Sequence, residues 1–192
     1  MRHPNLACRE DAFLVVIDMQ QAFWNLVGEK ERVLRSVELL LRCAAPLGLP
    51  VVATEQNPSK VGATMAAIGE LLAAAPVVEK MTFSCVAEPR FADTVAALGR
   101  KTAILCGIET HVCIMETALD LVQAGYRVHV PADGVTSRGE INWRVALDNM
   151  RTAGVIITTV EALLFQLLRR AGSDEFRAVM GLIKSAALWE KV

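Results

Sequence analysis

Residues 101–133, KTAILCGIETHVCIMETALDLVQAGYRVHVPAD, contain the pattern that decides the fold. Residues 101–108 are almost continuously apolar, which is typical of a strand that is covered on both faces. Residues 112–126 carry apolar side chains at helical spacing, and Gly125 predicts the end of that helix. A second apolar run at 126–133 follows at once. Strand, helix and strand in this order predict a parallel crossover unit.

The same alternation of strand and helix continues on both sides of this unit. Four further apolar runs of strand length occur, at residues 13–18, 49–55, 75–80 and 153–159. Six strands with helices between them predict an α/β fold, a three-layer Rossmann-like parallel sheet with helices on both faces. Two helical patterns follow the last strand, at 160–172 and 173–192. We expect the second of these to cover a sheet edge or to meet another subunit.

The composition is that of a folded protein with a large core. Of the 192 residues, 53% are hydrophobic and 21% charged, which excludes a disordered chain. We expect a single domain over residues 1–192. The formal net charge of −1 predicts no nucleic-acid or membrane partner. Residues 1–10 are polar, and no apolar run reaches the roughly 18 residues of a membrane span, so we expect a cytoplasmic protein.

Five cysteines are scattered along the chain: Cys8, Cys43, Cys85, Cys106 and Cys113. They form no Cys-x-x-Cys pair, and no cysteine and histidine residues cluster at the spacing of a zinc site. We therefore expect neither a metal nor a cofactor. A disulfide framework is not expected in a reducing cytosol.

Three reactive side chains stand at the ends of predicted strands. Asp18 ends the first strand, Lys80 ends the third, and Cys113 follows the fourth. Ligands of such sheets bind beyond the carboxyl ends of the strands, so we expect these side chains in one site. A thiol attacks as the thiolate, so we expect Lys80 and the start of a helix at Val112–Ala124 to lower the pKa of Cys113. Asp18 is expected to accept the thiol proton and return it to the leaving group.

Neighbouring residues complete the predicted site. The candidates for lining the substrate pocket are Phe23, Gln56, Phe83 and Thr110. We expect backbone N–H groups of residues 109–113 to form an oxyanion hole. His111 is not expected to act as the base, because residues two apart do not face each other on a helix. Asp133 is expected to tie its loop to Ser137 or Arg138.

Six segments resemble, in order, the motifs of the isochorismatase-like cysteine hydrolases. They are VVIDMQ (15–20), VVATEQNP (51–58), EKMTFSC (79–85), GIETHVCI (107–114), ADGVTSR (132–138) and AGVIITTVEALLFQLL (153–168). The segment FRAVMGLIK (176–184) also resembles one branch of the family, the isochorismatase domain-containing proteins.

This resemblance implies the strand order 3-2-1-4-5-6 and a catalytic triad made of the aspartate, lysine and cysteine above. It implies a cis peptide between Ile108 and Glu109, which would aim the N–H groups of Glu109 and Cys113 at an oxyanion. It also implies a homo-oligomer, a dimer or larger. Nicotinamidases of the family carry an Asp/His metal cluster after the second strand, whereas residues 55–58 here read EQNP, so no such metal site is expected.

We therefore expect a metal-independent cysteine hydrolase that cleaves a small amide or similar C–N substrate through a thioester on Cys113. One alternative is isochorismatase-type cleavage of a vinyl ether, in which protonation by Asp18 matters more. That site would need arginines or similar donors for two carboxylates, and the nearest in sequence are Arg90 and Arg138. The other alternative is a binding or scaffold protein that kept the fold without turnover.

Overall fold

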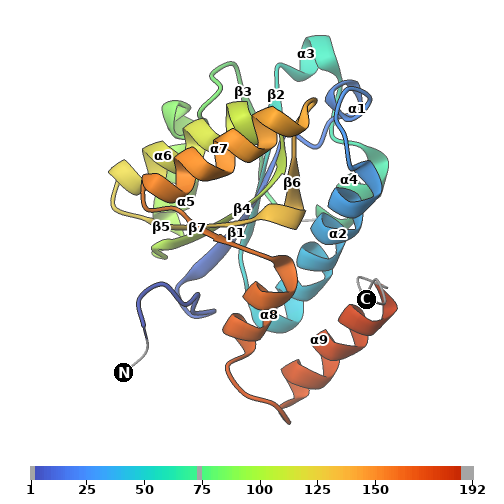
Figure 1. Cartoon of the computed structure of the whole chain (residues 1–192), viewed down its shortest axis with the longest axis vertical. Helices are drawn as coiled ribbons and strands as arrows, with labels where there is room; N and C mark the ends of the chain where they lie inside the picture. Colours follow the sequence, from blue (N-terminus) through green and yellow to red (C-terminus); the bar gives the residue numbers. More distant parts are fainter. Residues whose placement is uncertain (1–2, 73–74, 187–192) are drawn as a thin grey trace.

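A computed structural model describes residues 3–72 and 75–186 (Figure 1). Its parallel strands are β1 (Ala12–Ile17), β2 (Val51–Gln56), β3 (Val77–Lys80), β4 (Thr102–Ile108), β5 (Arg127–Pro131), β6 (Val135–Thr136) and β7 (Ile156–Thr158). The strands lie in the order β3-β2-β1-β4-β5-β7, with β6 beside β4. This confirms the predicted sheet order, in which the sixth expected strand is β7. The two-residue β6 is additional, because so short a strand leaves no periodicity in the sequence.

Helices cover both faces of this sheet. They are α1 (Gln21–Trp24), α2 (Lys30–Leu47), α3 (Pro58–Val61), α4 (Ala66–Leu72), α5 (Pro89–Ala97), α6 (Met115–Gln123), α7 (Glu140–Thr152), α8 (Val160–Leu168) and α9 (Asp174–Ser185). Short helical turns lie at η1 (Cys85–Ala87), η2 (Thr110–Ile114) and η3 (Ala132–Gly134). The core under α2, α4, α8 and α9 lies on one face, and the core under α5, α6 and α7 lies on the other (Figure 1).

Strands β1 and β4 form the centre of the sheet, and every side chain in both is buried. Their continuous apolar sequences fit this position, because both faces of a central parallel strand are covered by helices. Ile17 pairs with Gly107, so the two strands end at the same level. Asp18 and the segment after Ile108 therefore leave the sheet side by side.

Gly107 allows the close approach of these two strand ends. Its φ angle is +118°, and a Cβ atom there would lie 2.1 Å from the carbonyl oxygen of Ile17. A residue with a side chain is excluded on both grounds, since only glycine adopts this backbone conformation readily and leaves the space empty. The backbone of Ile17, the residue before Asp18, thus packs directly against Gly107 on the neighbouring strand.

The helix α9 is the described part of the segment 173–192. It begins at a Ser173 cap, whose hydroxyl oxygen accepts the N–H of Phe176 at 3.1 Å. Its buried residues Val179 and Ile183 join the core on the side of α2 and α8. The expectation that this segment covers a sheet edge is therefore wrong for the described part, which covers helices; residues 187–192 lie outside the described residues.

Among the residues that the structure describes, no helix combines the length and the apolar character that crossing a membrane requires.

Candidate active site at the carboxyl ends of the strands

The carboxyl ends of β1, β3 and β4 bring together the three side chains predicted from the sequence. The Lys80 Nζ atom lies 2.8 Å from Oδ2 of Asp18 and 3.5 Å from Sγ of Cys113. The exposed fractions of Asp18, Lys80 and Cys113 are 1%, 2% and 7%. The acid, the cation and the thiol therefore form one connected and almost fully buried cluster.

Neighbouring polar groups satisfy the buried ion pair. The Lys80 ammonium also donates to Oε1 of Gln56 at 2.6 Å and to the carbonyl oxygen of Thr82 at 3.2 Å. The hydroxyl of Thr54 donates to Oδ1 of Asp18 at 2.7 Å. A buried charge is tolerated when it is paired and hydrogen-bonded in this way, so the cluster can hold charge inside the protein.

The cluster keeps Lys80 charged. Burial on its own lowers the pKa of this ammonium, but the negative charge of Asp18 is the largest opposing effect, and the pKa lies above its usual value. The lysine is therefore protonated at neutral pH, and it can stabilise negative charge that develops on sulfur.

The same environment has the opposite effect on Cys113. Burial, and then the negative charge of Asp18, raise the pKa of this thiol, and together they outweigh the lowering effect of Lys80. The expectation of a lowered pKa is therefore wrong. The sequence indicates a nearby cation, but it does not indicate that a carboxylate already neutralises this cation in a buried pocket.

The helical segment around Cys113 begins earlier than predicted. A π-helical turn, η2, precedes α6, so Cys113 is the fourth residue of the helical segment and not its second. The carbonyl oxygen of Glu109 accepts the N–H of Val112 at 3.1 Å, which places the start at Thr110. The peptide bond between Ile108 and Glu109, just before this turn, is cis, as the resemblance implies.

A cavity of about 210 Å³ opens over Cys113. Apolar and polar side chains share its wall, namely Asp18, Phe23, Gln56, Phe83, Ile108, Glu109, Val112, Cys113 and Arg138. Phe23, Gln56 and Phe83 thus lie where the sequence places them. Thr110 does not line this cavity: it is fully buried, and its hydroxyl has no hydrogen-bond partner in the part of the chain that the structure describes.

An ion pair between Glu109 and Arg138 forms part of this wall, and the sequence did not predict it. The Arg138 Nε atom lies 3.1 Å and 3.0 Å from the two carboxylate oxygens, and Nη2 makes a further contact. The backbone N–H of Arg138 also donates to Oε2 at 2.9 Å. Burial on its own raises the pKa of Glu109, but Arg138 lowers it below its usual range. The sequence does not indicate this ion pair, because it depends on the pairing of β6 with β4, which brings Arg138 to the end of β4.

The loop that carries Arg138 has other contacts than expected. The ring Nδ1 of His111 lies 3.0 Å from the Ser137 hydroxyl, which holds the histidine to this loop. Asp133 does not bind Ser137 or Arg138 through any hydrogen bond found among the described residues. Its Oδ1 instead accepts the N–H of Val160 at 2.9 Å, at the start of α8, so the expected contact is wrong.

Polar contacts join the end of β2 to the segment that follows it. Glu55 accepts the backbone N–H and the hydroxyl of Thr64 at 2.6 Å and 2.7 Å. Within residues 3–72 and 75–186, no three His, Cys, Asp or Glu side chains converge as ligands for a metal ion.

A comparison with protein families decides the assignment. The model of the isochorismatase domain matches residues 12–162, a span that contains the whole cluster around Cys113. The chain belongs to the isochorismatase family.

Relatives within the isochorismatase family cover most of this chain. The secreted isochorismatase effector Isc1 of Phytophthora sojae is 41% identical over 175 residues, which are 89% of this chain and 83% of the relative. Isochorismatase domain-containing protein 1 of Salmo salar is 36% identical over 170 residues, which are 88% of this chain but 60% of that relative. The branch expected from the sequence is thereby confirmed. Because one relative is named as secreted, family membership does not fix the compartment.

A solved structure shares the complete isochorismatase fold. The MAR1 ribonuclease from Caenorhabditis elegans superposes with a TM-score of 0.87 at 32% identity, over 93% of this chain and 92% of the other.

Proposed function

We propose that this isochorismatase-family protein is a metal-independent cysteine hydrolase that cleaves a small amide or a similar C–N bond. The observation that carries the proposal is the buried cluster in which Lys80 contacts both Asp18 and Cys113, two residues that line the cavity. The cavity of about 210 Å³ lies below the range of about 300–1,000 Å³ that is usual for small-molecule sites, so the substrate is small.

In the first step the thiol must lose its proton as it attacks. Because the pKa of Cys113 is raised, the sulfur is a thiol at rest, and Asp18 takes the proton while Sγ bonds to the substrate carbonyl carbon. We assign the N–H groups of Glu109 and Cys113 to the oxyanion that forms. The positive charge of Lys80 then stabilises the sulfur as its negative charge grows.

In the second step the intermediate collapses. The C–N bond breaks, Asp18 returns its proton to the nitrogen, and ammonia or an amine leaves a thioester on Cys113. Asp18 then takes a proton from water, which attacks the thioester. The acid is released, and the proton returns to Sγ, which restores the thiol.

The other residues of the cavity position these groups and the substrate. Gln56, on the cavity wall, accepts a hydrogen bond from Lys80, and Thr54, outside the wall, donates one to Asp18. We assign Phe23, Phe83 and Gln56 to the substrate wall, with the two rings against its apolar part and the amide toward its polar part.

The test is ammonia release from a panel of small primary amides and ureas, measured for wild type, Cys113→Ala and Cys85→Ala. Cys85 is the matched control, because it is buried, does not line the cavity, and burial raises its pKa to about 11. We expect Cys113→Ala to lose about 10³-fold or more of the turnover and Cys85→Ala to keep it. Full turnover in Cys113→Ala would exclude the thioester, and no turnover by the wild type on any compound would favour a binding protein.

One observation favours a second function, the hydrolysis of a vinyl ether. Arg138 lines the cavity, as a site for a carboxylate-bearing substrate requires. Vinyl-ether hydrolysis ranks below amide hydrolysis because Glu109 already pairs with the guanidinium of Arg138. Release of pyruvate from isochorismate, followed with lactate dehydrogenase, would replace the amide proposal by this one.

The substrate is proposed to be a small molecule and not RNA, although one relative is named a ribonuclease. The small cavity and the net charge of −1 support this. Cleavage of a labelled RNA oligonucleotide that is lost in Cys113→Ala would contradict it.

A homo-oligomer, a dimer or larger, is also part of the proposal. Ile141 and Val145 are 56% and 48% exposed one turn apart on α7, and we propose that another subunit covers this apolar pair. The five free cysteines fit a reducing compartment, and we propose the cytoplasm. Light scattering after gel filtration tests the first point, and fractionation of the source cells tests the second.

A further inference from the structure

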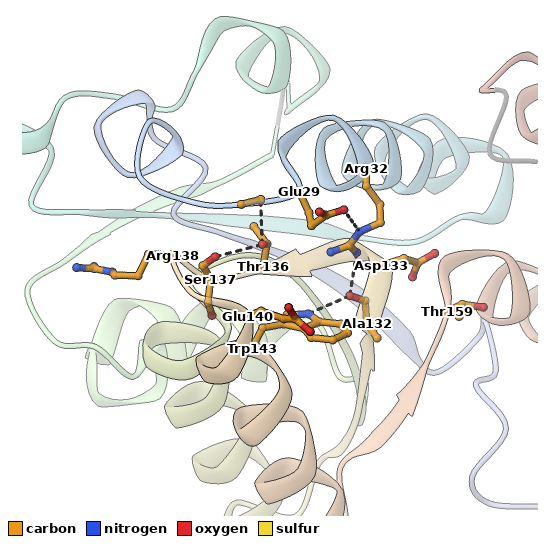
Figure 2. Close-up of a pocket in the computed structure, with 11 residues that line it drawn as sticks. Glu29, Arg32, Ala132, Asp133, Thr136, Ser137, Arg138, Glu140, Trp143 and Thr159 are labelled. Carbon is orange, nitrogen blue, oxygen red and sulfur yellow. Dashed lines mark hydrogen bonds and ion pairs between the residues drawn. The ribbon is translucent and has the colours of Figure 1, made fainter. Parts of the chain in front are cut away.

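A second cavity, of about 540 Å³, lies beside the loop that carries Arg138. Its volume falls within the range of about 300–1,000 Å³ that is usual for small-molecule sites. Figure 2 shows Glu29 and Arg32, from the start of α2, on one wall and Glu140 and Trp143, from α7, on the other. The cavity is therefore formed between the first turns of two helices that cover opposite faces of the sheet.

One backbone carbonyl holds a cation and an aromatic ring together in this cavity. The carbonyl oxygen of Ala132 accepts Nη1 of Arg32 at 3.1 Å and Nε1 of Trp143 at 3.3 Å. The guanidinium carbon of Arg32 lies 5.8 Å from the centroid of the Trp143 ring. Both side chains are thus fixed before any ligand arrives, which reduces the entropy lost on binding.

Most of the polar groups that line the cavity already have partners. Asp133 accepts the N–H of Val160, and the Thr136 hydroxyl donates to the carbonyl oxygen of Gly28. Arg138 is bound to Glu109, and its side chain points away from Arg32 in Figure 2.

Two charged side chains that line the cavity have hydrogen-bonding atoms without a partner among the described residues. Arg32 forms an ion pair with Glu29, which lies 3.6 Å from Nε and is 71% exposed, but its Nη2 donates no hydrogen bond within residues 3–72 and 75–186. The Glu140 carboxylate has neither an ion pair nor a hydrogen bond in the same described ranges. One guanidinium nitrogen, Nη2 of Arg32, and one exposed carboxylate, that of Glu140, therefore lack a partner among the described residues and line a cavity that also offers an indole ring.

We propose that this cavity is a second ligand site, distinct from the cavity at Cys113, for a zwitterionic amino acid with an apolar or aromatic side chain. The ligand carboxylate pairs with Nη2 of Arg32, its ammonium group pairs with Glu140, and its side chain lies on Trp143. A ligand of this kind gives a partner to Nη2 of Arg32 and to the Glu140 carboxylate without changing the net charge of the site. This proposal does not depend on catalysis at Cys113.

The test is isothermal titration calorimetry with three probes of the same shape: L-phenylalanine, phenethylamine, which lacks the carboxylate, and 3-phenylpropanoate, which lacks the ammonium group. We expect L-phenylalanine to bind the wild type at least about tenfold more tightly than either of the others, because each missing group loses one charge-assisted contact. Equal or tighter binding of phenethylamine or of 3-phenylpropanoate, or no binding of L-phenylalanine, would overturn the proposal.

Two variants test which residue binds the carboxylate of the ligand and which binds its ammonium group. Arg32→Met should abolish the advantage of L-phenylalanine over phenethylamine, and Glu140→Gln its advantage over 3-phenylpropanoate. Arg151→Met and Glu116→Gln are the matched controls, because both residues lie on helices outside this cavity. A loss of all binding without this selectivity, or the same change in the controls, would contradict the assignment.

The position of the site is tested with protein alkylated at Cys113 by iodoacetamide. Binding of L-phenylalanine should stay within about twofold of the unmodified protein. Loss of binding after alkylation would place the ligand in the cavity at Cys113 instead.

Discussion

Two buried ionisable groups in the same sheet, Lys80 at the end of β3 and His129 inside β5, are treated in opposite ways. Lys80 is surrounded by four hydrogen-bond partners, including the Asp18 carboxylate, and stays charged. Both ring nitrogens of His129 lack a partner among the described residues, and burial, with a smaller effect of Arg127, lowers its pKa to about 4. Charge inside this fold is therefore kept only where partners are provided.

This difference separates a site from a core. Both groups belong to strands, Lys80 at the end of β3 and His129 inside β5, yet the partners of Lys80 come from four separate segments. An arrangement that holds two charges away from water beside a thiol is expensive to build, and such groups concentrate at functional sites. His129 is instead a neutral packing residue.

The largest effect is expected when Lys80 is replaced, because Asp18 then loses its ion-pair partner. Lys80→Met should lower the free energy of unfolding by about 3–5 kcal/mol, because it leaves a carboxylate buried and unpaired. Urea denaturation followed by circular dichroism measures the change. Lys60→Met, at an exposed position, is the control and should stay within about 0.5 kcal/mol. Equal losses in both variants would mean that the ion pair is not buried as described.

The neutral histidine predicts a dependence of stability on pH. The folded-state pKa of His129 is about 4, compared with 6.5 as its ordinary value, so above pH 6.5 the histidine is neutral in both states and its contribution is complete. Below that pH the unfolded chain binds a proton that the folded chain does not, and stability falls until about pH 4. A difference of about 2.5 units at about 1.4 kcal/mol per unit gives a loss of about 3 kcal/mol.

Urea denaturation at several pH values between 7 and 4, for wild type and His129→Leu, isolates this effect from that of the carboxylates. The loss between pH 6.5 and pH 4 should be smaller in His129→Leu by about 3 kcal/mol. Parallel curves for the two proteins would show that His129 is not buried without a partner.

A substitution with a smaller expected effect tests a single hydrogen-bond partner of the buried ion pair. Thr54→Val removes the hydroxyl that donates to Oδ1 of Asp18 at 2.7 Å but keeps the shape of the side chain. We expect a loss of about 2 kcal/mol in the free energy of unfolding, the usual value for a hydrogen bond to a charged group. Thr152→Val, at an exposed hydroxyl on α7, is the control, with a loss below about 0.5 kcal/mol. Equal losses of free energy of unfolding in the two variants would show that Thr54 does not stabilise the Asp18 carboxylate.

The sheet order and the three reactive residues could be predicted because each depends on a local feature. Apolar runs of strand length mark β1, β3 and β4, and the topology then brings the residues that follow them to one edge. Asp18, Lys80 and Cys113 all stand at or just after such ends. The motif segments added the family, which the comparison confirms.

The electrostatics of the site could not be predicted in this way. The direction of the pKa shift of Cys113 depends on burial and on the distance to Asp18, and neither is visible in a sequence. The contact between Glu109 and Arg138 depends on a strand of two residues, which has no periodicity to detect. Thr110 is the first residue of the π turn before α6, where it is fully buried and does not line the cavity.

The measurement that tests the account most directly is the rate of Cys113 alkylation by iodoacetamide as a function of pH, followed by mass spectrometry. It should be compared in wild type, Asp18→Asn and Lys80→Met. We expect an apparent pKa in wild type above the free-thiol value of about 8.5, a lower value in Asp18→Asn and a higher value in Lys80→Met. An apparent pKa near about 8.5 that neither substitution changes would contradict the account, because the thiol would then be uncoupled from Asp18 and Lys80.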